Sequence, residues 1–330
     1  MFAEWGLLGN VLALLASLVV LDRASDWAIT NSVKIADITG FGKTTIGFIL
    51  VAFSTSLPEL CVSVFAAFGG GEEIGVAVGN VLGSNIVNIC LILGICFLAA
   101  ALKSSESVKL APVMAKEEMG TLYFGLFVAS VVPLVLLYLR FAGRFIGVIL
   151  LAIFVFYVYQ LSKVRKIREE GSLGEERRKL PLYTLFTLLG ITLVIVSAYF
   201  IVGSATYIAK SVGVPEIVIG ATIVAFGTSL PELATSFDAV QKGHMDLALG
   251  NIVGSCFINI TCILGVALIG ANLEAVDMAS FSHLVMFSLI TNLLLWYFLS
   301  SERISWREGT ILLVMYAIFI ATSFGGYQQT

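Results

Sequence analysis

Two glutamates stand out in this chain because each follows a proline within an otherwise apolar stretch. Glu59 follows Pro58, and Glu232 follows Pro231. A proline removes one helical hydrogen bond, so backbone carbonyls about one turn before it lose their donor. Inside a membrane, such carbonyls are tolerated only where they line a cavity or are buried in protein. A carboxylate at that depth is a functional-site candidate, because its insertion costs about 2.5–3.5 kcal/mol.

The surroundings of both glutamates are duplicated along the chain. Residues 51–60 (VAFSTSLPEL) recur as 224–233 (VAFGTSLPEL), and residues 79–94 (GNVLGSNIVNICLILG) recur as 250–265 (GNIVGSCFINITCILG). Spacings of three between serine and glutamate, and of four between serine and asparagine, place each pair on one helical face. Oxygen donors of this kind suit hard cations such as Ca²⁺ and Na⁺. The candidate donors are the side chains of Glu59, Glu232, Ser56, Ser229, Ser84, Ser255, Asn88 and Asn259, and backbone carbonyls near Thr55 and Thr228.

Charge balance at these donors favours exchange over simple passage. Two glutamates neutralise one Ca²⁺ or two Na⁺, so a site without cations would hold two negative charges in a low-dielectric interior. A carrier of this kind should cross its conformational barrier loaded rather than empty. The residues therefore favour an antiporter over a uniporter.

The elements that carry these residues must lie in lipid. The chain has 330 residues, of which 58% are apolar and 12% charged, with a mean hydropathy of +0.99. Globular proteins carry about 25% charged residues. The net charge of -3 provides no basic surface for nucleic acid. We expect a membrane protein with the lipid bilayer as its surroundings, and the sequence contains no evident protein partner, resident cofactor or enzymatic site.

Ten stretches are long and apolar enough to cross a bilayer. The predicted fold is an all-α membrane protein with ten transmembrane helices in two inverted-topology five-helix repeats, residues 1–161 and 182–330, joined by the charged linker 162–181. Because each half has an odd number of spans, the two copies enter the membrane in opposite directions. Glycines around the blocks let helices approach closely. The spans are 5–33, 44–68, 76–101, 121–139, 142–161, 182–211, 217–240, 246–270, 281–300 and 308–325.

The distribution of basic residues predicts the orientation. Fifteen of the 19 lysine and arginine residues lie in the loops that follow the odd-numbered spans. The positive-inside rule places these loops, including the linker, in the cytoplasm. We therefore expect a multi-pass protein of the cell membrane with both termini outside.

The paired GTSLPEL-type and GSN-type blocks, inverted around a linker, resemble the alpha repeats of the cation/calcium exchanger superfamily, most closely its prokaryotic-type sodium/calcium exchangers. The resemblance implies Na⁺/Ca²⁺ exchange by alternating access, with three Na⁺ per Ca²⁺. It implies that spans 1 and 6 form the mobile pair. It also implies a Ca²⁺ site formed by Glu59, Glu232 and the carbonyls of Thr55 and Thr228, with Asn88 and Asn259 completing the centre. Two Na⁺ sites are implied beside it. One consists of Ser56, Glu59, Ser255 and the Ala52 carbonyl, and the other of Ser229, Glu232, Ser84 and the Ala225 carbonyl.

The chain departs from the family pattern at three positions. Ser54 stands where the first motif usually has glycine, and Cys256 stands where the second has asparagine. Asn259 occupies a position where the potassium-dependent branch has aspartate, which argues against potassium transport. The linker is too short for the calcium-sensing domains of animal exchangers, so we expect an unregulated core transporter.

Alternative interpretations remain open from the sequence. Protons could replace Na⁺ as the coupling ion in a Ca²⁺ or Mn²⁺ antiporter with the same site. A cation channel and an intramembrane protease are disfavoured, because no continuous pore motif and no catalytic dyad are evident. Structural roles are the alternative for the serines and asparagines, and Asp238 is interpreted as a solvated helix end. The five cysteines are interpreted as packing residues, and Asp22, Arg23 and Asp26 as a mutually paired cluster.

Overall fold

The computed structural model describes residues 2–39, 55–69, 74–103, 108–109, 116–162, 179–270, 276–301 and 303–325. Most of these residues are helical, and each predicted span contains at least one helix. The helices are α1 (Phe2–Thr39), α4 (Leu57–Gly69), α5 (Ile74–Ile86), α6 (Leu93–Lys103), α7 (Lys116–Leu139), α8 (Arg144–Ser162), α10 (Leu180–Val212), α11 (Glu216–Ile219), α12 (Ala225–Thr228), α13 (Leu230–Gln241), α14 (Met245–Ile258), α15 (Leu264–Gly270), α16 (Ser282–Ser300) and α17 (Trp306–Gly325), with π-helical turns η2 (Val87–Ile92), η3 (Gly220–Val224) and η4 (Asn259–Ile263) and the 3-10 turn η5 (Met278–Phe281).

Length and hydropathy make this a multi-pass membrane protein. Among the described residues, seven helical stretches are long and apolar enough to cross a bilayer, and a bent pair, Glu216–Thr228 and Leu230–Gln241, makes an eighth if counted as one span. Leu57–Phe68 and Arg144–Tyr159 are shorter apolar helices. They lie in the predicted spans 44–68 and 142–161, and most of the first half of span 44–68 lies outside the described residues. The count of ten spans therefore stays a prediction.

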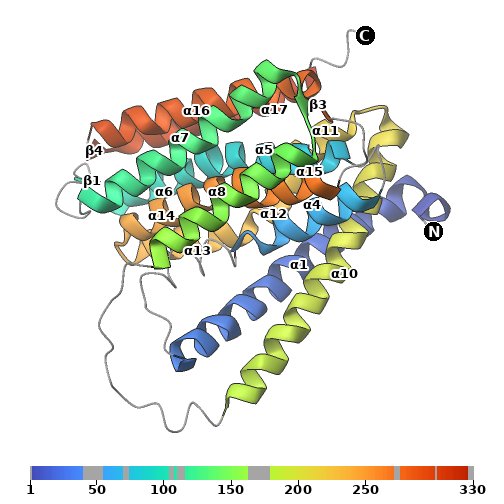
Figure 1. Cartoon of the computed structure of the whole chain (residues 1–330), viewed down its shortest axis with the longest axis horizontal. Coiled ribbons are helices and arrows are strands. Elements are labelled where there is room, and N and C mark those ends of the chain that lie inside the picture. The colour runs from blue at the N-terminus through green and yellow to red at the C-terminus, as the bar shows by residue number, and fades with distance from the viewer. Residues whose placement is uncertain are drawn as a thin grey trace.

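Two short antiparallel ladders, which the sequence analysis did not predict, join loops at the ends of the helices. Strand β1 (Val108–Lys109) pairs with β4 (Arg303–Ile304), and β2 (Phe141–Ala142) pairs with β3 (Val276–Asp277). Figure 1 shows β1 and β4 together at one end of the helices and β3 at the other end. Each ladder joins one loop from the first half of the chain to one loop from the second half.

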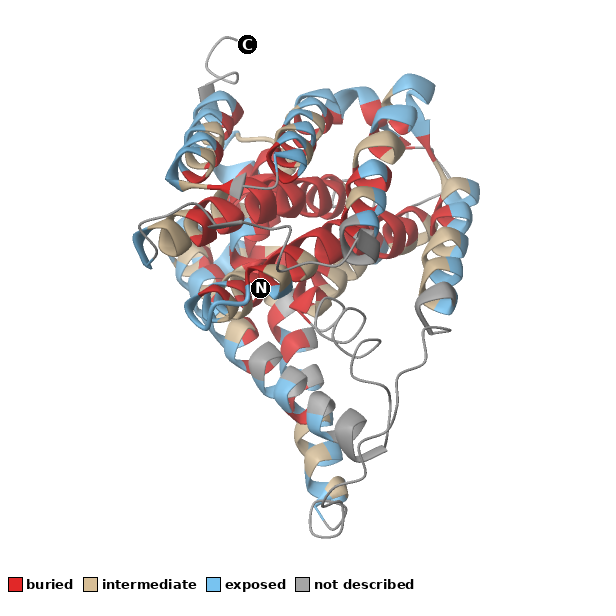
Figure 2. Ribbon diagram, turned by 90° about the vertical axis from the view of Figure 1, so that its left-hand side faces the viewer, coloured by how far each residue is buried: buried red, intermediate tan, exposed pale blue. Residues whose placement is uncertain are grey.

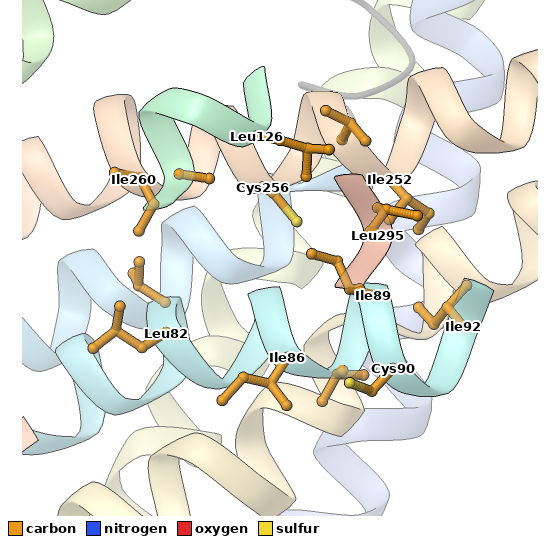
Figure 3. Close-up of a cluster of buried hydrophobic side chains, with 14 of the residues drawn as sticks. Leu82, Ile86, Ile89, Cys90, Ile92, Leu126, Ile252, Cys256, Ile260 and Leu295 are labelled. Carbon is orange, nitrogen blue, oxygen red and sulfur yellow. The ribbon is translucent and has the colours of Figure 1, made fainter. Parts of the chain in front are cut away.

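The core consists of the helices that contain the second sequence blocks. Nearly every residue from α5 through η2, and from α14 through η4, is buried. These segments are mostly apolar, with buried serines and asparagines among the apolar residues, and burial on all sides is typical of helices surrounded by other helices. Figure 2 shows the buried residues concentrated at the centre and the exposed ones on the outer helices. Figure 3 shows Cys90 and Cys256 among isoleucines and leucines of this core, and all five cysteines are free thiols.

Glycines bring the backbone of α5 into direct contact with the backbones of α11 and η3. A Cβ added at Gly83 would lie 2.3 Å from the carbonyl oxygen of Ala221, and one added at Gly79 would lie 2.5 Å from that of Ile217. Such distances leave no room for a side chain. The expectation of close helix approach is therefore confirmed for these glycines, but it is wrong for Gly250, where an added Cβ would meet no atom within 4 Å.

The two long helices α1 and α10 pack mainly on each other. Figure 1 shows them side by side, crossing below the layer that contains α5 and α14. Trp27 stacks on Phe186 with ring centroids 5.1 Å apart, and Phe2 lies 5.8 Å from Tyr199. These are the helices of predicted spans 1 and 6, and their mobility stays a prediction.

Candidate ion-binding site

The glutamates begin new helices instead of interrupting one. Glu232 lies in the first turn of α13, which starts after Ser229 adopts non-helical dihedrals (φ -87, ψ 9) and the chain bends by 45°. Pro231 is tolerated there because the amide of a first-turn residue has no helical partner to lose. Glu59 and Pro58 occupy the same positions in α4. Each proline therefore lies in the first turn of the helix that contains its glutamate, where its missing amide costs no helical hydrogen bond.

Each glutamate accepts a hydrogen bond from a serine of the opposite half of the chain. Ser229 donates to Oε1 of Glu59 at 2.9 Å, and Ser56 donates to Oε1 of Glu232 at 3.3 Å. These partners are 170 and 176 residues apart in the sequence. Ser255 of α14 donates a second hydrogen bond to Oε1 of Glu232, at 3.3 Å. The two sequence repeats therefore form one polar cluster.

The carboxylates of this cluster are fully buried and only partly satisfied. Glu59 and Glu232 have no exposed surface, and Oε2 of each has no hydrogen-bond partner among the described residues. A buried charged oxygen without a partner is energetically costly. A cation between the two carboxylates would offset that cost directly.

The second blocks contribute further buried polar atoms at π-helical turns. Asn88 lies in η2 and Asn259 begins η4, and π-helical turns are frequent at functional sites. Oδ1 of Asn259, both polar atoms of Asn88 and the hydroxyl of Ser84 are buried without a partner among the described residues. Asn259 donates through Nδ2 to Oδ1 of Asn85 at 3.0 Å. Its own oxygen is thereby left available for a ligand.

The backbone carbonyls predicted as ion ligands differ in how far the structure describes them. Ala52 lies outside the described residues. The Ala225 carbonyl accepts the Ser229 amide at 3.1 Å and the Thr228 hydroxyl at 3.3 Å. Thr55 and Thr228 are fully buried next to the breaks that precede the glutamates.

Several buried residues of the cluster were missed by the sequence analysis. Asn80 and Asn251 are counterparts in the two second blocks, and each bonds to a threonine of the opposite half. Ser63 and Ser236, each four residues after a glutamate, bond to these asparagines. The duplicated Gly-Asn pair that opens each second block was the available signal.

Charged residues near the cluster fall outside it. Asp238 forms an exposed i,i+4 ion pair with Lys242 at 2.5 Å, which agrees with its interpretation as a helix end. Asp22 lies 3.8 Å from Arg23. Among the described residues, no group of three or more His, Cys, Asp and Glu could hold a metal ion. The atoms that the structure brings together around the glutamates are carboxylate and hydroxyl oxygens, a donor type that suits hard cations.

Membrane helices that break at buried carboxylates, with oxygens from both halves of the chain around them, are typical of ion-transporting membrane proteins. Sequence comparison identifies the particular family. The profile of the sodium/calcium exchanger protein family matches residues 9–163 and 182–325. The chain belongs to this family of exchangers, which confirms the resemblance seen in the repeated blocks.

Individual relatives match over nearly the whole chain. The sodium/calcium exchanger MaX1 of Methanosarcina acetivorans is 29% identical over 364 residues, covering 96% of this chain and 98% of MaX1. A solved structure of the sodium-calcium exchanger NCX_Mj is 28% identical with a TM-score of 0.66, covering 96% of this chain and 99% of that one. The H⁺/Ca²⁺ exchanger CAX shares the fold, with a TM-score of 0.77 at 19% identity, over 96% of this chain and 87% of that chain.

Proposed function

We propose that this chain is a secondary antiporter that exchanges Na⁺ for Ca²⁺ by alternating access. The observation that carries the proposal is the reciprocal pairing of Ser229 with Glu59 and of Ser56 with Glu232. It joins two buried carboxylates, each with an unpartnered oxygen, at the breaks of two spans. The names of MaX1 and NCX_Mj support Na⁺ and Ca²⁺ as the exchanged ions.

In this proposal one Ca²⁺ binds between the carboxylates, and Na⁺ binds on either side. Hydroxyl and carbonyl oxygens complete each shell, and the amide oxygens of Asn88 and Asn259 complete the centre. The Ca²⁺ ligands are Glu59, Glu232 and the carbonyls of Thr55 and Thr228; the Na⁺ ligands are Ser56, Glu59, Ser255 and the Ala52 carbonyl at one site and Ser229, Glu232, Ser84 and the Ala225 carbonyl at the other.

Sharing of the glutamates explains exchange. Because the same two carboxylates serve both ions, Ca²⁺ and Na⁺ compete for them, and occupancy by one releases the other. Without either cation, two buried charges would remain uncompensated, which makes movement of the empty carrier slow. Binding of three Na⁺ per Ca²⁺ would move one net charge in each cycle.

The proposed architecture is ten transmembrane helices in two inverted five-helix repeats, 1–161 and 182–330. The two ladders support it, because each joins one loop of the first half to one loop of the second half. Both termini lie outside and the linker 162–181 lies in the cytoplasm, as the excess of lysine and arginine in that linker favours. Helices α1 and α10, which pack on each other, form the pair that slides past the core.

Uptake of radioactive Ca²⁺ into proteoliposomes tests this function. Vesicles loaded with Na⁺ or with choline, at equal pH on both sides, should accumulate Ca²⁺ only when Na⁺ is inside. Glu59→Gln and Glu232→Gln should each abolish uptake, because loss of one partner from a buried charged pair costs about 3–5 kcal/mol, or more than about a hundredfold in affinity. Asp238→Asn is the matched control, since it makes the same chemical change at an exposed position of the same helix.

Three results would contradict the proposal in different ways. Uptake that ignores Na⁺ but follows an imposed pH gradient would assign the coupling to protons at the same carboxylates. Downhill Ca²⁺ flux with no counter-ion would indicate a channel. Full exchange by both glutamine variants would remove the proposed site altogether.

A further inference from the structure

The four asparagines of the second blocks divide into two kinds by their hydrogen bonds. Asn88 and Asn259 keep buried oxygens without partners among the described residues, as expected of ligands. Asn80 and Asn251 are also buried, at 0% and 6% exposure, but both polar atoms of each amide are hydrogen-bonded within the protein. Each of their amide oxygens accepts a threonine hydroxyl, whereas the amide oxygens of Asn88 and Asn259 have no such partner among the described residues. The hydrogen bonds of Asn80 and Asn251 instead connect parts of the protein to one another.

Asn80 connects the helix of one glutamate to the break before the other. Its Oδ1 accepts the hydroxyl of Thr228 at 3.1 Å. Its Nδ2 donates to the hydroxyl of Ser63 at 3.2 Å and to the backbone carbonyl of Glu59 at 3.4 Å. One side chain on α5 therefore contacts α4, which contains Glu59, and the end of α12, just before the helix that contains Glu232.

Asn251 repeats this arrangement in the other half of the molecule. Its Oδ1 accepts the hydroxyl of Thr55 at 3.3 Å, and its Nδ2 donates to the hydroxyl of Ser236 at 3.0 Å. Thr55 precedes the helix of Glu59, and Ser236 lies on the helix of Glu232. The recurrence in both repeats argues against an accidental packing contact, because each asparagine bonds to residues of both halves of the chain.

We propose that Asn80 and Asn251 are positioning residues that hold Thr228 and Thr55 so that their backbone carbonyls face the Ca²⁺ site. Thr228 is the last residue of α12 and lies directly before the non-helical Ser229. A peptide unit at such a break is not held by a continuous helix, so an anchored side chain limits its rotation. Each threonine hydroxyl donates its proton to the asparagine in this anchoring, and the backbone carbonyl of the same threonine is the ligand in the proposed Ca²⁺ site. This inference rests on the proposed Ca²⁺ site and adds the residues that organise it.

Calcium titration of purified protein, with the melting temperature measured in parallel, tests the inference. Thr228→Val removes the hydroxyl and keeps the carbonyl, so the Kd for Ca²⁺ should rise about fivefold, the factor expected for loss of one buried hydrogen bond. Thr228→Ser keeps the hydroxyl and should restore binding. Asn80→Ala should raise the Kd at least as much, since it also removes the bonds to Ser63 and to the Glu59 carbonyl. The double variant should bind no more weakly than Asn80→Ala alone, because Thr228→Val then removes no further interaction between these two residues.

Thr222→Val is the matched control. Thr222 lies in the same broken span and is buried, but its hydroxyl bonds to the Val218 carbonyl of its own helical segment at 2.6 Å. Its replacement should leave the Kd for Ca²⁺ unchanged. The control thus separates loss of the Asn80 contact from loss of any buried hydroxyl.

The possible results are distinguishable. If the wild type binds Ca²⁺ and Thr228→Val binds it equally tightly while melting at a lower temperature, Asn80 is merely structural and the inference is overturned. Additive effects of Asn80→Ala and Thr228→Val would overturn it as well. A wild-type protein that binds no Ca²⁺ would overturn the proposed function and this inference together.

Discussion

Replacement of the two bridging serines should have unequal effects, although their sequence contexts are nearly identical. Ser229→Ala removes the serine hydrogen bond to Glu59, which is 2.9 Å long. Ser56→Ala removes a 3.3 Å bond to Glu232, but Ser255 still donates to the same oxygen at 3.3 Å. The Glu59 carboxylate therefore loses more hydrogen-bond stabilisation in Ser229→Ala than the Glu232 carboxylate loses in Ser56→Ala.

The magnitude follows from the charge of the acceptor. A hydrogen bond to a charged group contributes about 1.5–3 kcal/mol. At about 2 °C per kcal/mol for a chain of this size, Ser229→Ala should lower the melting temperature of the ion-free protein by about 3–6 °C. Ser56→Ala should lower it by less than half as much, since one donor remains on Glu232.

Thermal unfolding in detergent, with and without Ca²⁺, measures the decrease in melting temperature caused by each substitution. Bound Ca²⁺ would supply the positive charge that the carboxylates lack, so saturating Ca²⁺ should narrow the gap between the two variants. Equal melting temperatures for Ser229→Ala and Ser56→Ala without ions would refute the reasoning. A gap that Ca²⁺ leaves unchanged would show that the serines do not act through the ion-binding carboxylates.

Two further predictions use counterpart positions of the repeats as controls. Gly79→Ala should prevent folding or strongly lower the melting temperature, because the added Cβ would lie 2.5 Å from a backbone carbonyl oxygen of a neighbouring helix. At Gly250 an added Cβ would meet no atom within 4 Å, so Gly250→Ala should be tolerated or should stabilise the protein by up to about 1 kcal/mol. Equal melting temperatures of the two variants would contradict this packing. Asn85→Ala should raise the Kd for Ca²⁺ about fivefold by releasing the amide of Asn259. Cys256→Ala, at the counterpart position, should raise the Kd less. Calcium titration of both variants measures this difference, and equal Kd values would contradict the prediction.

Much of this protein can be inferred from its sequence alone. Low charge and high hydropathy require lipid around the helices, and the duplicated blocks identify the family and its glutamates. The two prolines predict a distortion of the helix beside each glutamate. These inferences succeed because composition, helix breaking and repetition are local properties that do not depend on distant contacts.

Other features depend on the three-dimensional structure. Asn80 and Asn88 are both buried asparagines of one block, yet the first bonds to Thr228, Ser63 and Glu59, whereas both polar atoms of the second have no partner among the described residues. No local pattern separates them.

The same holds for the glycines and the serines. Gly79 and Gly250 are counterparts in sequence, but only Gly79 lies against a neighbouring backbone. Ser229 reaches a glutamate 170 residues away rather than the one three residues after it. Each of these outcomes is set by how the two halves of the chain pack together. Hydrogen bonds and close contacts depend on that packing to within a few tenths of an ångström. The linear order of residues does not specify distances at that precision.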